Sequence, residues 1–173
     1  MNTLIRKAQH HDEESFVTLM ESNAKDMYKI AYAILSNNED VADAIQDTIL
    51  SCWEKLHTLK QEEYFKTWMT KILMNHCNRI LRKKRRLVPT DTVFDIQCGE
   101  ECSGYKNAEW QEMLQCIDEK YRIVLVLYYG EGFKVREISE ILQESESAVK
   151  RRLVGARKRM EQMYYPEKRR DSK

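Results

Sequence analysis

The stretch from residue 134 to residue 159 constrains this chain most, because two short amphipathic segments follow one another across a brief polar break. Apolar residues recur at helical spacing in both segments, namely Val135, Ile138, Ile141 and Leu142, then Val149, Leu153 and Ala156. Gln143, Glu144 and Ser145 between them are few enough for a tight turn. The pattern predicts a helix-turn-helix, whose second helix enters the DNA major groove.

Charge is concentrated in blocks along the chain. Residues 79–86 hold six basic and no acidic side chains, and residues 150–173 hold ten basic against three acidic ones. The segments before and between these blocks are net acidic, and the whole chain carries +1. Two cationic patches on an anionic body indicate two separate contacts with a polyanion.

Composition narrows the fold class and the location. With 5 Gly and 2 Pro among 173 residues, the chain is expected to be all-α. No run approaches the roughly 18 apolar residues of a membrane span, and residues 1–20 lack the apolar stretch of a signal peptide. An odd set of five cysteines fits a reducing compartment, so we expect a cytoplasmic protein.

The sequence shows no recognisable set of catalytic or metal-binding residues. The chain contains no nucleophile, base and carboxylate at readable spacing and no phosphate-binding glycine loop, so no enzyme activity and no cofactor are predicted. Cys98 and Cys102, with His76 and Cys77, lack a paired second set of zinc ligands, and no metal site is predicted.

Three helices are predicted in the first part of the chain. They span residues 12–36, 39–56 and 64–84, with Asn37 and Asn38 capping the second and a polar loop at 57–63. The first is expected to bury Phe16, Leu19, Met20, Met27, Ile30, Ala31 and Ile34. The second is expected to bury Val41, Ile45, Ile49, Trp53 and Leu56, and the third Phe65, Trp68, Ile72, His76 and Ile80.

A break in periodicity divides the chain into two small helical domains. Residues 1–86 form the first domain, and residues 87–107, with Pro89, Gly99 and Gly104, form a flexible linker. The second domain, residues 108–173, begins with a helix carrying Trp110, Leu114 and Ile117, followed by a helix over 119–129 and the helix-turn-helix. Gly155 interrupts the last helix, where we expect it to let the backbone approach DNA closely.

The second and third predicted helices carry opposite charge. Asp40, Asp43, Asp47 and Glu54 line one side of the second helix, and no Lys or Arg lies between Asp40 and Glu54. We expect this acidic stripe to dock a basic partner. The third helix ends in the cation cluster at 79–86, preceded by the amides Asn75 and Asn78, a combination suited to single-stranded or opened DNA.

These segments together resemble a known family. The chain is similar to the extracytoplasmic-function (ECF) class of sigma factors, small two-domain members of the bacterial sigma-70 family. The first domain matches through residues 38–47, Trp53, 65–68, Asn75 and 81–86. The second matches through residues 121–125, 128–132, 137–139, 148–153 and 156–157.

The resemblance implies an alternative sigma factor that binds core RNA polymerase and recognises the −35 and −10 promoter elements, assisting in melting the latter. The residues implied to grip the β′ clamp helices are Asp40, Asp43, Gln46 and Asp47. Those implied at the −10 element are Leu59, Lys60, Asn75, Arg79 and Arg82. At the −35 element, base reading falls to Lys150, Arg151 and Val154, and phosphate contacts to Arg152, Arg157 and Lys158.

The resemblance also implies partners beyond DNA. The second domain is expected to rest on the polymerase β flap, and an anti-sigma factor, often a membrane protein, is expected to hold the free protein. Two other interpretations stay open from the residues alone. One is a self-sufficient helix-turn-helix regulator, and the other is an interaction protein whose acidic helix engages a protein partner. Neither the promoter nor the inducing signal follows from the sequence.

Overall fold

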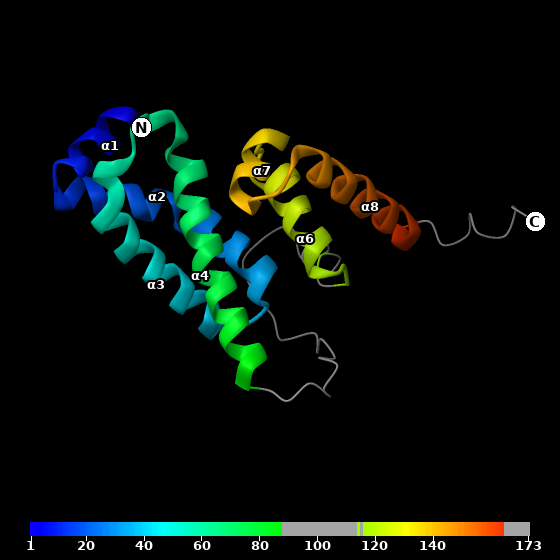
Figure 1. The fold of residues 1–173 in the computed structure, drawn as a ribbon. Helices are drawn as coiled ribbons and strands as arrows, with labels where there is room; N and C mark the ends of the chain where they lie inside the picture. Colours follow the sequence, from blue (N-terminus) through cyan, green and yellow to red (C-terminus); the bar gives the residue numbers. More distant parts are fainter. Residues whose placement is uncertain (88–113, 115, 165–173) are drawn as a thin grey trace, which may run out of the picture.

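The computed structural model describes residues 1–87, 114 and 116–164 of the chain. Within these residues every regular element is helical, so the expected fold class is confirmed there (Figure 1). Leu87 ends a helix instead of beginning the linker, and the rest of the predicted linker lies outside the described residues, as does Trp110. No helix in the described part of the chain is long and apolar enough to cross a bilayer.

Four α-helices build the N-terminal part: α1 (Asn2–Gln9), α2 (Glu13–Leu35), α3 (Asn38–Lys55) and α4 (Phe65–Leu87). Short 3-10 turns, η1 (Leu56–Thr58) and η2 (Glu62–Tyr64), form the loop before α4. The expected helix ends hold to within a few residues, because side chains cap them. Asp12 accepts the Ser15 N–H at 2.8 Å, and Asn37 accepts the Asp40 N–H at 3.0 Å.

The core of the N-terminal part lies between α2, α3 and α4. Every core residue expected on α2 is buried. On α3, by contrast, Ile45, Ile49 and Trp53 are only partly buried, and the most enclosed positions after Val41 are Ala44, Thr48 and Cys52. On α4 Phe65 is buried as expected, and Met69, Thr70, Leu73 and Cys77 are fully enclosed, whereas Trp68, Ile72, His76 and Ile80 flank them. On α3 and α4, most of the residues that face the core therefore lie about one position away from the expected ones.

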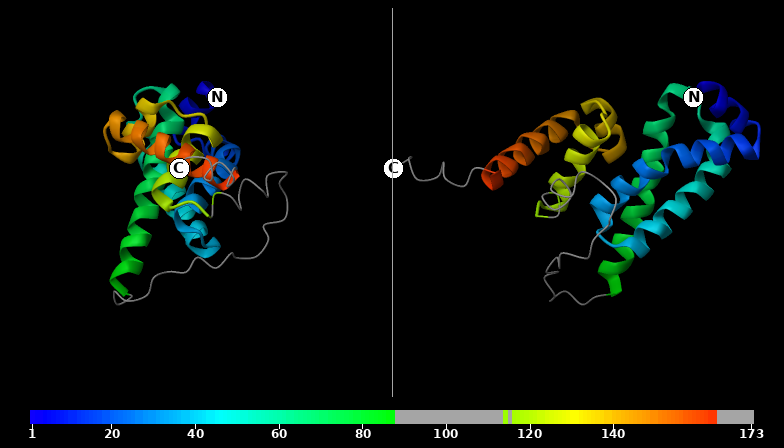
Figure 2. Two further views of the ribbon diagram at one scale, coloured as in Figure 1. Left: turned by 90° about the vertical axis from the view of Figure 1, so that its right-hand side faces the viewer. Right: turned by 180° about the vertical axis from the view of Figure 1, so that it is seen from behind.

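The C-terminal part contains α6 (Glu119–Leu125), the π-helical turn η3 (Val126–Gly130), α7 (Val135–Leu142) and α8 (Glu146–Tyr164). Leu114, Ile117, Ile123, Val124 and Leu127 are buried. α7 packs against α4, and α6 packs against α2, so the two parts touch each other. α8 projects away from the N-terminal bundle (Figures 1 and 2).

Candidate nucleic-acid interface

The helix-turn-helix forms as predicted. The Glu137 carboxylate accepts the Lys134 N–H at 2.8 Å and caps the start of α7. Gln143 ends α7 in the left-handed region, with φ 56°, and the Ser145 hydroxyl accepts the Ala148 N–H at 3.2 Å at the start of α8. Each of the core residues Ile138, Ile141, Val149, Leu153 and Ala156 is buried. This packing fixes the direction in which α8 presents its other side chains.

The outward face of α8 carries cations around an exposed apolar residue. Val154 is 65% exposed, although it is aliphatic. Lys150 and Arg151 are exposed one turn before it, and Arg157 and Lys158 are exposed one turn after it. A face of this kind suits DNA, because cations hold phosphates and a methyl-bearing side chain contacts the thymine methyl group.

Arg157 and Arg152 are among the α8 cations that also have partners inside the protein. The Arg157 Nε donates to the Tyr129 hydroxyl at 2.6 Å, and its guanidinium lies 5.8 Å from the centre of that ring. Arg152 is half-buried and donates to Glu144 at 2.6 Å. These contacts hold both guanidinium groups in fixed positions beside the exposed face.

The structure gives Gly155 a role that differs from the expected one. A Cβ at this position would lie 2.8 Å from Cε1 of Tyr121 on α6, far inside normal contact distance. The glycine therefore faces the interior of the C-terminal part and lets α8 pack on α6. The expectation that it brings the backbone close to DNA is wrong.

The acidic stripe on α3 is partly neutralised by the end of α4. Asp40 forms an ion pair with Lys84, and Asp47 forms one with Arg79, with His76 Nδ1 3.8 Å from the Asp47 carboxylate. The sequence showed no Lys or Arg between Asp40 and Glu54, and the structure supplies the compensation from another helix. Asp43 and Gln46 are exposed on the same stripe.

An apolar side chain also lies on this face of α3. Leu50 is 62% exposed and follows Gln46 by one helical turn. The sequence analysis did not select it, although its spacing from Asp43 and Gln46 was readable. A solvent-facing leucine among carboxylates is a feature of protein-docking surfaces.

The candidate −10 residues divide into exposed and covered ones. Lys60 and Asn75 are exposed, and Arg82 is exposed with its Nε donating to the Asn78 carbonyl at 3.2 Å. Leu59, however, is only 8% exposed, so its side chain is not presented to a base in this arrangement. Its carbonyl accepts a 2.8 Å hydrogen bond from Gln9, which fixes the loop against α1.

A cleft separates the end of α4 from the C-terminal part. It has a volume of about 360 Å³ and is lined from the α4 side by Asn75, Asn78, Leu81, Arg82 and Arg85, and from the other side by Glu119, Ile141, Leu142 and Gln143. Two candidate −10 residues thus share one cleft with the helix-turn-helix.

His76, Cys52 and Cys77 have shifted pKa values. Burial and the neighbouring Arg79 charge lower the pKa of His76, which therefore stays neutral at pH 7 and shares a 2.9 Å hydrogen bond with Ser51. Burial raises the pKa of the Cys52 and Cys77 thiols to about 12. Cys98 and Cys102, considered above as metal ligands, lie outside the described residues.

Comparison with known sequences connects the two parts of the chain. Residues 19–87 match the family described as Sigma-70 region 2, and residues 107–160 match Sigma-70, region 4. RNA polymerase sigma factor SigV of Bacillus subtilis is 30% identical over 146 residues, covering 83% of this chain and 87% of that protein. ECF RNA polymerase sigma factor SigW of the same bacterium is 22% identical over 173 residues, covering 86% and 88%.

Two solved structures share the fold. CnrH in complex with the cytosolic domain of CnrY aligns with a TM-score of 0.69 and 22% identity, covering 95% of this chain and 97% of that chain. The sigma factor RpoE in complex with the anti-sigma factor NepR, from Bartonella quintana, aligns with a TM-score of 0.69 and 18% identity, covering 90% and 97%.

Proposed function

Because the chain belongs to the sigma-70 family of RNA polymerase sigma factors, in its ECF group, we propose that its two helical parts divide promoter recognition between them. It is an alternative sigma factor that directs promoter-specific transcription initiation, and the stand-alone regulator is not favoured, because both sigma regions match. Sigma factors are regulatory subunits, so this chain contributes binding surfaces to a polymerase that does the chemistry. We propose no catalysis of its own.

The proposed polymerase contact is the outer face of α3. Asp43 and Gln46 are exposed there, and Asp40 and Asp47 extend the same stripe. Carboxylates next to an exposed leucine suit a basic and partly apolar helical surface, which is the chemistry we assign to the β′ clamp helices. The C-terminal part is proposed to rest on the β flap.

The proposed DNA contacts lie on α8 and around α4. On α8, Lys150, Arg151 and Val154 read bases in the −35 major groove, and Arg152, Arg157 and Lys158 hold phosphates. At the −10 element, Lys60 and Asn75 contact the opened strand, with Arg79 and Arg82 near its backbone. Leu59 joins this set only if the loop before α4 rearranges. The exposed, cation-rimmed Val154 on a correctly formed helix-turn-helix is the observation that carries this assignment.

An anti-sigma factor is also proposed as a partner. One protein of similar fold has been solved with an anti-sigma factor and another with the cytosolic domain of CnrY. As a polymerase subunit, the chain is proposed to act in the cytoplasm. An anti-sigma factor that is a membrane protein would hold it at the inner face of the membrane.

Run-off transcription with purified bacterial core polymerase tests these assignments. The template carries the promoter of the protein's own operon, and the variants are Asp43→Ala combined with Gln46→Ala, and Lys150→Ala combined with Arg151→Ala. The matched control is Glu21→Ala, which removes an exposed carboxylate from α2. We expect a transcript that depends on the protein and survives the control.

The two double variants should fail for different reasons. The α3 variant should lose co-elution with core polymerase, whereas the α8 variant should retain co-elution and lose transcription from the −35-dependent template. Full activity of the α3 variant would reject α3 as the polymerase contact. No transcript and no co-elution with the unaltered protein would reject the polymerase role itself and favour a regulator acting on its own.

A further inference from the structure

Arg157 of α8 is held in place by a partner that carries no charge. Its Nε donates to the hydroxyl of Tyr129 at 2.6 Å. Three other cations of α8 pair with carboxylates instead, namely Lys150 with Glu146, Arg152 with Glu144 and Arg159 with Asp118. A carboxylate partner offsets the charge of a cation, whereas a hydroxyl does not. Arg157 therefore has a defined position and keeps its full charge for an anion.

The Tyr129–Arg157 pair presents hydrogen-bond donors that the described part of the chain leaves unused. The two terminal nitrogens of the Arg157 guanidinium bond to no other described residue. Since the Tyr129 hydroxyl accepts the bond from Arg157, its own proton is left to donate, and no described residue accepts it. A hydroxyl that accepts from a cation becomes a stronger donor. A guanidinium edge beside an O–H group is complementary to the oxygens of one phosphate.

Tyr129 is fixed by its surroundings and open to solvent. It lies in the π-helical turn η3, where the Glu131 N–H donates to the Val126 carbonyl five residues earlier at 2.9 Å. The Tyr128 ring meets the Tyr129 ring edge to face, with 4.9 Å between the centres. Tyr129 is nevertheless 48% exposed. Turns of this kind are frequent at functional sites, because they direct side chains away from the regular helical positions.

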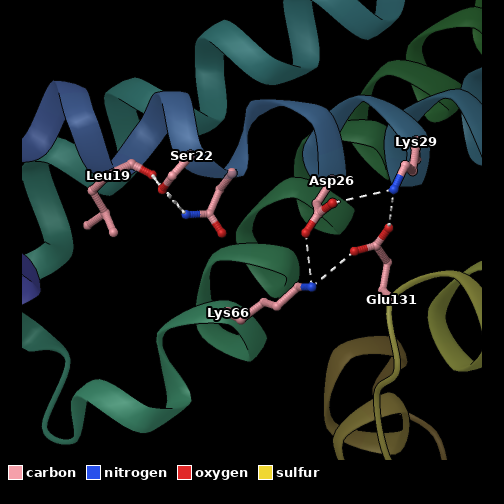
Figure 3. Close-up of polar contacts among 7 residues, drawn as sticks. Leu19, Ser22, Asp26, Lys29, Lys66 and Glu131 are labelled. Atoms are coloured by element: carbon pink, nitrogen blue, oxygen red, sulfur yellow. Dashed lines mark hydrogen bonds and ion pairs between the residues drawn. The ribbon is translucent and has the colours of Figure 1, made fainter. Parts of the chain in front are cut away.

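Glu131, two residues after Tyr129, does not offset the charge of Arg157. Its carboxylate lies 3.4 Å from Lys29 Nζ and 3.0 Å from Lys66 Nζ (Figure 3). Asp26 completes this cluster at 3.5 Å from Lys29 and 3.0 Å from Lys66. Two carboxylates and two ammonium groups balance each other, so the cluster itself does not attract a phosphate. The carboxylate of the turn is thus engaged by α2 and α4, on the side away from α8.

Arg157 borders the exposed apolar residue on the outward face of α8. It follows Val154 by three residues, which is nearly one helical turn. A side chain that contacts a base in the major groove has DNA phosphates on either side of it, and contacts to them set the position of the helix. The anion expected next to Arg157 is therefore a phosphate of the DNA that α8 reads.

We propose that Tyr129 and Arg157 together bind one phosphate of the −35 DNA, with Tyr129 both positioning the guanidinium and donating its own hydroxyl hydrogen bond. The proposal rests on the proposed −35 contacts of α8 and adds to them a residue outside the helix-turn-helix. The pair sets the position of α8 along the groove and reads no base.

Promoter binding by the reconstituted holoenzyme tests the pair. The duplex carries the promoter of the protein's own operon, and fluorescence anisotropy measures its affinity over a series of salt concentrations. Arg157→Gln should weaken binding about tenfold and make the slope of log affinity against log salt less steep by about 0.9, the value of one phosphate contact. Tyr129→Phe should weaken binding about threefold to tenfold and leave the slope unchanged, because it removes a hydroxyl and no charge.

Tyr121 and Arg159 provide a matched control pair on the other side of the same helix. Arg159 lies two residues after Arg157, about 200° around α8, with its guanidinium 3.9 Å from the centre of the Tyr121 ring. Tyr121→Phe and Arg159→Gln should leave the affinity and the salt slope close to those of the unaltered protein. Circular dichroism verifies that every variant keeps its helix content, and co-elution verifies that it joins core polymerase.

A neutral phosphate analogue tests the contact directly. Each phosphate across the −35 element is replaced in turn by methylphosphonate, which carries no charge. One of these positions should weaken binding by the unaltered protein about tenfold and leave binding by Arg157→Gln unchanged, because the variant has already lost that contact.

The remaining outcomes would overturn the pair in distinguishable ways. Equal losses in the control pair would reduce the effect to general charge or stability. Loss of co-elution with core polymerase would assign Arg157 to an acidic surface of the polymerase and not to DNA. If Lys150→Ala combined with Arg151→Ala weakens promoter binding and neither Tyr129→Phe nor Arg157→Gln does, the pair is rejected and the −35 surface stands. If none of these variants weakens binding, the proposed −35 surface fails as well.

Discussion

Replacing Gly155 with alanine should destabilise the C-terminal part, although alanine is the better helix former. The Cβ of alanine would lie 2.8 Å from Cε1 of Tyr121 and 3.5 Å from both Cζ and the hydroxyl of the same ring. The ring is not free to swing aside, because the Arg159 guanidinium lies 3.9 Å from its centre. Either the ring or α8 must shift to admit the methyl group.

Two effects of opposite sign set the magnitude. Alanine in place of glycine in a helix interior is worth about 1 kcal/mol in favour of folding. Forcing one extra carbon into a packed contact typically costs about 1–3 kcal/mol. The balance predicts a net loss of about 1 kcal/mol for Gly155→Ala. In a Tyr121→Ala background the obstacle is gone, and the same substitution should stabilise by about 1 kcal/mol.

Hydrogen exchange of the α8 amides is the suitable assay, because it reports on this helix and not on the whole chain. Four proteins are compared: the unaltered chain, each single variant and the double variant. The expected result is a change of sign between the two backgrounds. Equal stabilisation by Gly155→Ala in both backgrounds would refute the steric argument, and a glycine needed only for DNA approach would give that result.

Three further predictions follow from local features. His76 has a lowered pKa, so the folded protein binds fewer protons at this site than the unfolded chain. The free energy of unfolding should therefore fall as the pH drops below about 7. In denaturant titrations, His76→Gln should make the free energy of unfolding less dependent on pH. At pH 8, iodoacetamide should modify exposed Cys116 before buried Cys52 and Cys77, whose thiol pKa values are about 12, as peptide mass spectrometry would show. Asn37→Ala removes the cap of α3 and should cost about 1 kcal/mol in thermal unfolding.

Helical periodicity predicted where the helices lie better than it predicted which face of each helix is buried. On α2 one broad apolar stripe left a single choice of core face. On α3 two neighbouring rows of residues could face the core. The row with Ala44, Thr48 and Cys52 is the more deeply buried one, and the row with the larger side chains is only partly buried. Small side chains let helices approach closely, so they occupy the contact, while Ile45 and Ile49 pack at its edges. The sizes of the side chains along one helix do not reveal which of its faces packs against a neighbouring helix.

Helix α1 was not predicted, and its contacts explain why. It is short, and only Ile5 and Ala8 are buried, so no long periodic stretch marks it. Its position depends on distant residues: Gln9 donates to the carbonyls of Leu56 and Leu59 at 3.1 and 2.8 Å, and Arg6 pairs with Glu62 at 2.5 Å. Contacts of this sequence separation cannot be read from a local pattern.

In the structure, the charge blocks of the sequence also form ion pairs with one another. Read alone, they indicated separate contacts with a polyanion; folded, blocks of opposite sign also pair with each other, as Asp47 does with Arg79. Exposed pairs of this kind contribute only about 0–1 kcal/mol, so they hold side chains in place more than they stabilise the fold. If polymerase engages Asp47 as proposed, the Arg79 guanidinium loses its partner and becomes available to a DNA phosphate. The proposed polymerase and −10 surfaces are then linked through a single ion pair, and the link is weak enough for binding energy to break.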